Sequence, residues 1–177
     1  TQLTALGETV TLFPITTALP SIIQQVTATE PLPLRGILHL WALADAPWPD
    51  STALMAQQER NLDSVVQLVQ TLAKAGSGAG TPRLWVVTKG AQQTTATEAV
   101  AVAQTPLWGL GRVVALEHGM VWGGLLDIDD GTTPQALLAE LLATAAAGET
   151  QVAYRRGTRY GARLVRQPLS RKNQRAV

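Results

Sequence analysis

Residues 103–129, AQTPLWGLGRVVALEHGMVWGGLLDID, decide the fold of this chain, because they predict a helix followed directly by a buried strand. We expect Thr105 to cap the helix, Pro106 to occupy its first position and Gly119 to end it in a left-handed conformation. Residues 122–127 are a short apolar run that ends in acidic and turn residues, which is typical of a central strand in a parallel sheet. The stretch therefore favours an α/β fold.

The predicted helix has an apolar face and two internal glycines. One side carries four aliphatic residues at the spacing of a 3.6-residue turn: Leu107, Leu110, Val113 and Val114. Gly109 and Gly111 each cost about 0.5–1 kcal/mol relative to alanine inside a helix. We therefore expect a neighbouring backbone to approach the helix closely at these two positions.

Strands are predicted on both sides of this stretch. Threonines alternate with Val10 and Leu12 in residues 9–13, as in a half-buried strand, whereas residues 35–43 are almost continuously apolar, as in a strand buried on both faces. Residues 83–88 predict another strand. Residues 151–166 predict two strands joined by a turn at residues 156–158.

Helices are predicted between these strands. They cover residues 1–7, where Gly7 stops the last turn, residues 21–27, the long amphipathic stretch 51–75, and a helix from Pro134 through residue 147 with Thr133 as its N-cap. The inner stripe of the long helix is predicted to consist of Leu62, Val65, Val69 and Leu72. This alternation predicts a doubly wound parallel sheet with helices on both faces and an antiparallel edge.

Composition narrows the class of protein. A chain of 177 residues with 46% hydrophobic and 15% charged residues fits one domain with a real core. It has no cysteine, which excludes disulfides, thiolate metal sites and a cysteine nucleophile. No apolar run approaches the roughly 20 residues of a membrane span, and the first residues do not resemble a signal peptide. We expect a cytoplasmic protein.

The charges are unevenly placed, although the net charge is only +1. No acidic residue follows Glu149, while the last 23 residues hold eight of the fourteen cations. A basic tail can follow nucleic acid phosphates, but only Tyr154 and Tyr160 could stack on bases here. We therefore favour an exposed hairpin followed by a linker at residues 167–177, without nucleic acid binding.

The glycine pair raises the question of a dinucleotide site. Residues 109–114 carry the first two glycines of a dinucleotide fingerprint, but Val114 stands in place of the third, and the motif lies inside a predicted helix instead of a strand-to-helix turn. Reduction of a carbonyl on such a fold would need a tyrosine with a lysine one helical turn later. Tyr154 is followed four residues later by Thr158, and Tyr160 by Leu164.

Other chemistry is equally unsupported. There is no G-x-S-x-G motif. His39 in an apolar strand and His118 at a helix end are predicted to be structural. A partial calcium-loop pattern is one residue short and lacks its glutamate, which favours turn acids: Asp127, Asp129, Asp130 and Gly131. Core packing is the prediction for Trp41, Trp85 and Trp122, while Trp48 and Trp108 stay open. We predict no catalytic, cofactor-binding or metal-binding residue.

The segments TPLWGLGRVVALEHG and WGGLLDID resemble the structural, non-catalytic half of the ketoreductase region of modular type I polyketide synthases. So do GILHLWALADA, PRLWVVTKGAQ and QVAYRRGTRYGARLVR, in the same order along residues 36–166. The resemblance implies a degenerate Rossmann-like, short-chain dehydrogenase-like fold over residues 1–166, truncated at the N-terminus with its first strand missing, and a linker at residues 167–177 to the next domain.

The resemblance also implies a partner. The catalytic half of such a ketoreductase carries the NADPH loop and the Ser, Tyr and Lys, whereas the equivalent Tyr and Lys positions here fall near Val100 and Gln104, which cannot do that chemistry. The leading hypothesis is a subdomain, inactive alone, that supports the NADPH-dependent half reducing a 3-ketoacyl-ACP intermediate beside neighbouring synthase domains such as an enoylreductase. The alternatives are a pseudo-ketoreductase spacer beside a methyltransferase, dehydratase or enoylreductase, and a complete nucleotide-dependent enzyme with an unrecognised site.

Overall fold

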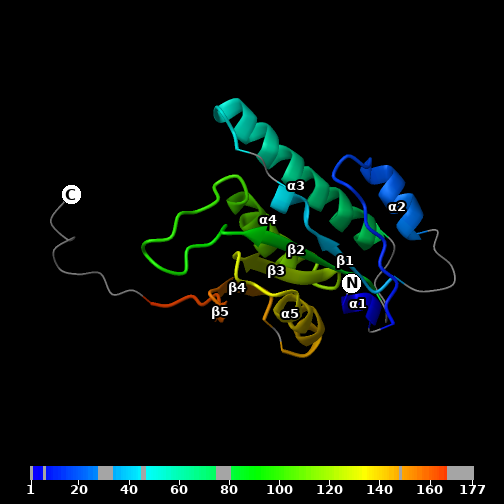
Figure 1. Cartoon of the computed structure of the whole chain (residues 1–177). Helices are drawn as coiled ribbons and strands as arrows, with labels where there is room; N and C mark the ends of the chain where they lie inside the picture. The colour runs from blue at the N-terminus through cyan, green and yellow to red at the C-terminus, as the bar shows by residue number, and fades with distance from the viewer. Residues whose placement is uncertain are drawn as a thin grey trace.

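Five strands form one sheet whose order follows the chain, β1-β2-β3-β4-β5. The first four are parallel to one another and β5 pairs antiparallel with β4 (Figure 1). Their bounds are β1 (Gly36–His39), β2 (Arg83–Lys89), β3 (Trp122–Ile128), β4 (Gln151–Arg155) and β5 (Thr158–Gly161). The predicted parallel sheet with an antiparallel edge is confirmed.

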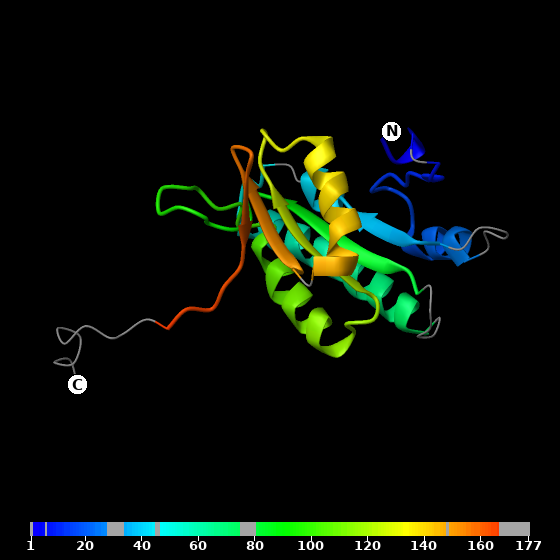
Figure 2. The ribbon, with the colours of Figure 1, turned by 90° about the horizontal axis from the view of Figure 1, so that it is seen from below.

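The helices lie on both faces of this sheet. The computed structural model describes residues 2–5, 7–27, 34–44, 47–74, 81–147 and 149–166. The helices are α1 (Gln2–Ala5), α2 (Leu19–Thr27), a 3-10 turn η1 (Trp41–Ala44), α3 (Ser51–Lys74), α4 (Thr105–Glu117) and α5 (Pro134–Ala147). Figure 2 shows α3 and α4 on one face and α5 on the other. The chain thus has the predicted Rossmann-like, doubly wound architecture.

The last parallel crossover differs in hand from the first two. From β1 to β2 and from β2 to β3 the chain passes over the same face, through α3 and then α4. From β3 to β4 the sheet grows in the same direction, but α5 packs on the opposite face. Because the direction is unchanged and the face is reversed, the third crossover has the opposite hand, against the strong right-handed preference of such connections.

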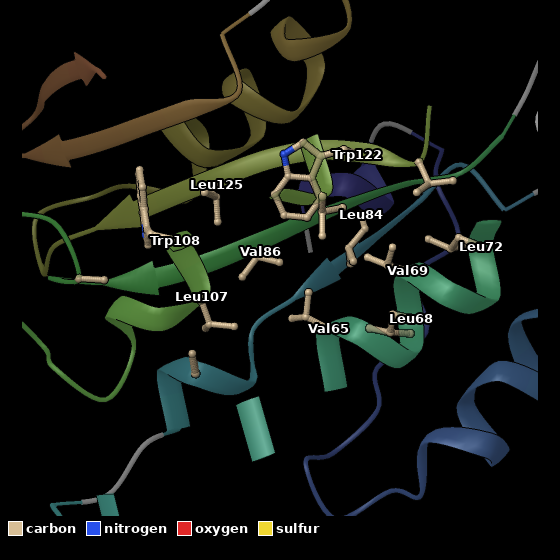
Figure 3. Packing of buried hydrophobic residues seen from close by; sticks show 14 residues of the cluster. Val65, Leu68, Val69, Leu72, Leu84, Val86, Leu107, Trp108, Trp122 and Leu125 are labelled. Atoms are coloured by element: carbon tan, nitrogen blue, oxygen red, sulfur yellow. The ribbon is translucent and has the colours of Figure 1, made fainter. Parts of the chain in front are cut away.

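Each face has its own core, because successive strand residues point to opposite sides. Leu84, Val86 and Leu125 pack against α3 and α4 (Figure 3). Val87 and Leu126 pack on the other side against α5. The predicted inner stripe of α3 is confirmed, with Val65, Val69 and Leu72 buried and Leu62 partly buried against the first core.

The predicted ends of α4 are wrong. Thr105 is the first helical residue, and its hydroxyl donates to the Ala101 carbonyl over 3.2 Å instead of capping. Gln104 takes the N-cap position without a side-chain cap, and Pro106 therefore occupies the second helical position. At the other end His118 is the C-cap residue, and Gly119 is not among the residues with positive φ.

The two glycines of α4 differ in their surroundings. A Cβ at Gly111 would lie 2.8 Å from side-chain atoms of Leu125 and Trp122, so β3 packs closely there. The predicted close approach is thus confirmed at Gly111, although side chains make it and not a backbone. A Cβ at Gly109 would have no neighbouring atom within 4 Å, so the predicted close approach is wrong there. Val113 is likewise exposed, not part of the buried face.

Two predicted strands are corrected by the structure. Residues 9–13 are not a strand, and Leu12 is exposed there. The strand predicted at residues 35–43 ends at His39 and turns into η1, which contains Trp41. It is only partly buried for most of its length, because no strand in the described part of the chain pairs with its outer edge.

Other predicted boundaries are confirmed. The Thr133 hydroxyl accepts a hydrogen bond from the Ala136 N–H over 3.2 Å, as an N-cap should. Gly7 has a φ of 83° after α1. The hairpin turn between β4 and β5 consists of Arg156 and Gly157, both with positive φ, as a type I′ turn requires.

Some predictions fall outside the described residues. These are the linker at residues 167–177, the last residue of the helix predicted at 51–75, and the helix stop at Gly148. Of the helices that the structure describes, none combines the length and apolar character needed to cross a membrane.

Candidate functional site

The carboxyl ends of β2 and β3 form the candidate site, because open α/β sheets bind their ligands in the crevice outside the carboxyl ends of the strands. Thr88 and Asp127 are register partners near these two ends. After β2 the chain makes a long loop, residues 90–104, which projects beyond the sheet before α4 begins (Figure 2). The residues around Asp127 therefore decide what this edge can do.

Asp127 is fully buried, and its carboxylate is saturated by donors from the protein itself. Thr88 Oγ1 donates over 2.6 Å, the Ala91 N–H over 2.8 Å and the Gln92 N–H over 3.0 Å. The guanidinium of Arg155, at the end of β4, also donates to it. A buried charge is tolerated only when it is paired and hydrogen-bonded, as it is here.

Arg155 ties the same loop to β4. Besides Asp127, its guanidinium donates to the Gln92 carbonyl over 2.6 Å, and its Nε lies 3.4 Å from a carboxylate oxygen of Glu98. Hydrogen bonds from the backbone and hydroxyl of Thr94, together with the charge of Arg155, hold the pKa of Glu98 below its usual range. Residues from the start and the middle of the loop thus converge on one ion-pair network.

Two further contacts close the base of the loop. Trp108 Nε1 donates to Thr88 Oγ1 over 2.9 Å, which places the buried indole against the end of β2 (Figure 3). The Gln104 side-chain oxygen accepts from the Lys89 N–H over 2.8 Å. The unassigned Trp108 is therefore a core residue with a satisfied N–H, while Trp48 is exposed.

The positions aligned with catalytic residues have other roles. Val100 is an exposed loop residue, and Gln104 is buried and bound to the β2 backbone. The glycine pair 109 and 111 lies inside α4, as predicted, so no glycine-rich turn connects a strand to this helix. With Asp127 already saturated, the residues at this edge do not fit a dinucleotide.

Asp129 belongs to a turn, as predicted. Its carboxylate accepts hydrogen bonds from the Arg156 N–H over 2.6 Å, the Thr132 hydroxyl over 2.8 Å and the Gly131 N–H over 3.1 Å, and these hold its pKa below the usual range. Asp130 pairs at the surface with Lys89. Within the described ranges, no group of three His, Cys, Asp or Glu residues could hold a metal ion.

The basic residues of the hairpin are largely paired within the fold. Arg159 donates to the buried Glu140 of α5, over 2.6 Å and 2.8 Å, and these bonds hold the pKa of Glu140 below its usual range. Tyr154 also donates to this carboxylate, over 2.8 Å. Arg163 pairs with Glu149. These two arginines are thus paired with carboxylates of the same fold.

His39 is buried at the end of β1, where its Nε2 lies 2.8 Å from Ser64 Oγ. Burial lowers the pKa of His39 to about 4. The Ser64 hydroxyl donates to the Asn61 carbonyl within α3 over 2.8 Å. The contact between His39 and Ser64 ties β1 to α3. His118 is exposed just after α4.

An open pocket of ≈ 230 Å³ lies between the start of the loop, α4 and the hairpin. No charged group lines it, although the Arg112 guanidinium stands 6.0 Å from the Trp108 ring nearby. The lining residues are Gln92, Gln93, Thr94, Trp108, Gln151, Ala153, Tyr160, Gly161 and Ala162. The side chains that line this pocket are therefore neutral, and the Thr94 and Tyr160 hydroxyls are its polar OH groups.

The ion pair of Asp127 and Arg155 was not predicted from the sequence. Asp127 was interpreted as a turn residue, and Arg155 as one of the basic residues near the C-terminus. The available signal was an acid at the end of a continuously apolar strand, since buried acids require a cation. The cation itself lies 28 residues further along the chain, on the neighbouring strand.

Comparison with known proteins places this geometry in a family. Residues 6–164 match the family model described as "Polyketide synthase extender module SpnB, Rossmann fold domain". The chain is 39% identical over 143 residues to polyketide synthase GfsA of Streptomyces halstedii. It is 38% identical over 137 residues to the pikromycin polyketide synthase component PikAII of Streptomyces venezuelae. The matched parts cover 79% and 76% of this chain, but only 2% and 4% of those synthases.

Solved ketoreductases share the fold. A C2-type ketoreductase from a modular polyketide synthase superposes with a TM-score of 0.64 and 31% identity, covering 85% of this chain and 32% of that one. An A-type ketoreductase gives 0.59 and 28%, covering 81% and 29%. The chain thus spans about a third of the ketoreductase chains it matches. It belongs to the Rossmann-fold domains of the ketoreductase region of modular polyketide synthases.

Proposed function

We propose that this domain is the non-catalytic structural half of a polyketide synthase ketoreductase. It supports the NADPH-dependent catalytic half that reduces a 3-ketoacyl-ACP intermediate. The observation that carries this proposal is the carboxyl edge of the sheet, where Asp127 is saturated by Thr88, Arg155 and the N–H groups of the loop. A reductase of this fold needs that edge for its cofactor.

The relative lengths of the matched chains support the same proposal. The domain corresponds to 32% of a C2-type ketoreductase chain and 29% of an A-type ketoreductase chain. About two-thirds of each of those chains therefore lies outside the matched part, which leaves ample polypeptide for a separate catalytic half. Neighbouring synthase domains, including an enoylreductase where one is present, are the other expected partners.

The proposal is tested by expressing the parent ketoreductase polypeptide with and without residues 1–166. NADPH oxidation is then followed with a ketoacyl thioester. The half-life of this activity is measured at one fixed temperature, as a measure of kinetic stability. We expect the 177-residue chain alone to give no turnover, and the catalytic half to lose activity faster without it. Turnover by the 177-residue chain alone would contradict the proposal.

Two alternatives give different results. A complete enzyme with an unrecognised site would bind NADPH, so calorimetry of the 177-residue chain would detect heat of binding. A pseudo-ketoreductase spacer would leave the half-life of any neighbouring reductase unchanged on removal. Only the proposed supporting role combines absence of binding with a shortened half-life.

A further inference from the structure

β5 is the last strand of the sheet, and its outer side is unpaired in the described part of the chain (Figure 1). All four of its residues are exposed. The Ala162 N–H donates to the Gln151 carbonyl over 3.2 Å, so this residue directs its backbone groups toward β4. Because these directions alternate along an antiparallel strand, Tyr160 also faces β4, whereas the N–H and C=O groups of Arg159 and Gly161 point outward.

The usual protections of an exposed sheet edge are missing from residues 158–162. Natural sheets guard such edges with lysine, proline or a β-bulge. This segment, TRYGA, contains neither lysine nor proline, and its register with β4 runs from Thr158 to Gly161 without a bulge. Its charged side chain, that of Arg159, turns to α5, where it donates to the Glu140 carboxylate over 2.6 Å and 2.8 Å. The edge is therefore open to a further strand.

The chain exposes apolar side chains along the same edge. Tyr160 within β5 is 38% exposed, and beyond the strand Val165 is 72% and Leu164 is 104% exposed. Neighbouring strands bury such side chains through cross-strand pairs. A strand added along residues 158–165 would thus satisfy the outward backbone groups and cover these side chains together.

A pocket adjoins this edge. Tyr160, Gly161 and Ala162 form one side of the open pocket of ≈ 230 Å³ that Trp108 and Gln151 also line. Peptides that add to a sheet edge gain affinity from main-chain hydrogen bonds and specificity from pockets for alternate side chains. Because the lining of this pocket is neutral, it suits an uncharged side chain of the added strand.

The charges at the two ends of the edge indicate the chemistry of the partner. The guanidinium groups of Arg156, in the turn before β5, and of Arg166, after it, have no acidic partner among the described residues. A second copy of β5 would pair antiparallel by two-fold symmetry and bring Arg156 of one copy toward Arg166 of the other. Acidic side chains on the added strand would neutralise both cations, which favours an acidic partner over a second copy.

We propose that the outer edge of β5 docks an extended acidic peptide segment, which joins the five-stranded sheet as a further strand. The backbone of the segment bonds to Arg159 and Gly161, and its acidic side chains lie near Arg156 and Arg166. This inference goes beyond the proposed function, because the edge of β5 is a different surface from the carboxyl edge around Asp127.

The test measures amide hydrogen exchange of the 177-residue chain by NMR, with and without a synthetic probe. The probe is a short peptide, blocked at both ends, that alternates glutamate with valine. At saturation we expect exchange at the Arg159 and Gly161 N–H groups to slow at least about tenfold, because they become hydrogen-bonded. Exchange at Tyr160 and Ala162 should change by less than about twofold, because these residues already face β4. Unchanged exchange at Arg159 and Gly161 would overturn the proposal.

Two matched probes separate strand pairing from charge attraction. The same peptide with every backbone amide N-methylated keeps its charge but cannot approach as a strand, so it should slow exchange at neither Arg159 nor Gly161. A peptide with lysine in place of glutamate keeps its backbone and should bind at least about tenfold more weakly. If either control slows exchange as fully as the glutamate peptide at the same concentration, the proposal is wrong.

A substitution in the chain tests the charge argument. Arg166→Glu should weaken binding of the glutamate peptide about fivefold, whereas Lys74→Glu, at the exposed end of α3, should leave binding within about twofold. Equal effects would contradict an acidic partner at β5, because net charge alone would then explain the binding.

The remaining outcomes can also be told apart. If exchange at Arg159 and Gly161 slows with rising protein concentration in the absence of peptide, the occupant is a second copy and the proposal is wrong. The half-life of the reductase with and without residues 1–166 decides the proposed function separately, since it involves no peptide. Failure at the edge of β5 therefore leaves the supporting role intact.

Discussion

The carboxyl edge of the sheet and the outer side of α4 are two surfaces of the same fold with opposite character. At the carboxyl edge, where Rossmann-like proteins bind ligands, the buried Asp127 carboxylate is saturated by internal donors. On the outer side of α4, where water is expected, Val113 and Leu116 are exposed. The polar group at the carboxyl edge is satisfied within the fold, whereas the outer side of α4 exposes apolar side chains to solvent.

The carboxyl edge of this sheet differs from that of ligand-binding sheets of the same architecture. A sheet that binds a ligand keeps polar groups available at its carboxyl edge, whereas here Thr88, Ala91 and Gln92 all donate to the Asp127 carboxylate. The apolar surface of α4 has nothing to bind within the described residues.

The largest expected effect is the loss of stability on substitution of Asp127 at the carboxyl edge. Asp127→Asn removes the buried partner of Arg155 and leaves it only the Glu98 carboxylate, so we expect a loss of about 3–5 kcal/mol of stability. Asp130→Asn removes an exposed partner of Lys89 and should cost less than about 1 kcal/mol. Urea denaturation of both variants measures the difference. Equal effects would show that the network around Asp127 is not what holds the edge together.

The next effect depends on pH and concerns His39, at the end of β1. Its folded-state pKa of about 4 lies below the ordinary histidine value of 6.5, so between these values the unfolded chain binds more protons than the folded one. Stability is therefore fully present above about pH 6.5 and falls as the pH drops toward 4, by at most about 3 kcal/mol.

Urea midpoints measured from pH 7 to pH 4 test this linkage. His39→Gln should flatten the profile above about pH 5, because its side chain does not titrate. Glu140 provides a useful contrast: its pKa is lowered by Arg159, so its contribution is present above its unfolded pKa and is lost only as the pH falls through the more acidic range. An unchanged slope between pH 6.5 and pH 5 in His39→Gln would exclude His39 as its source.

The smallest effects compare the two sides of α4 through its glycines. Gly111→Ala would place a methyl group 2.8 Å from Leu125 and Trp122 atoms, so we expect a loss of about 1–3 kcal/mol. Gly109→Ala in the 177-residue chain should gain about 0.5–1 kcal/mol. Thermal unfolding of the two variants measures both signs. If both substitutions destabilise the chain, the outer side of α4 is not open space.

Elements with strong local patterns were predictable from the sequence. The periodicity of α3, the cap of α5 by Thr133 and the hairpin turn at Arg156 each depend on residues close in the chain. The strand predicted at residues 9–13 failed because alternation alone supplies no partner strand. The strand predicted at residues 35–43 ended early, because an apolar run can continue as a 3-10 turn equally well.

The site was less predictable, because its contacts join distant residues. The cap of α4 was misplaced since the side chain of Gln104 binds the Lys89 N–H, a tertiary contact that local capping rules do not include. The Asp127–Arg155 pair joins two neighbouring strands across a whole helix. The apolar outer side of α4 was also hidden, since Val113 was assigned to the buried face from its spacing alone.

The reversed hand of the third crossover bears on the order in which the chain folds. The elements from β1 to β3 share one core through α3 and α4, whereas β4 is added from the other side of the sheet with α5. Arg155 lies on β4, so the Asp127 carboxylate can gain this cation only when β4 docks. We therefore expect the first core to form early and β4 to dock late, with substitutions in the first core slowing folding more than substitutions in β4.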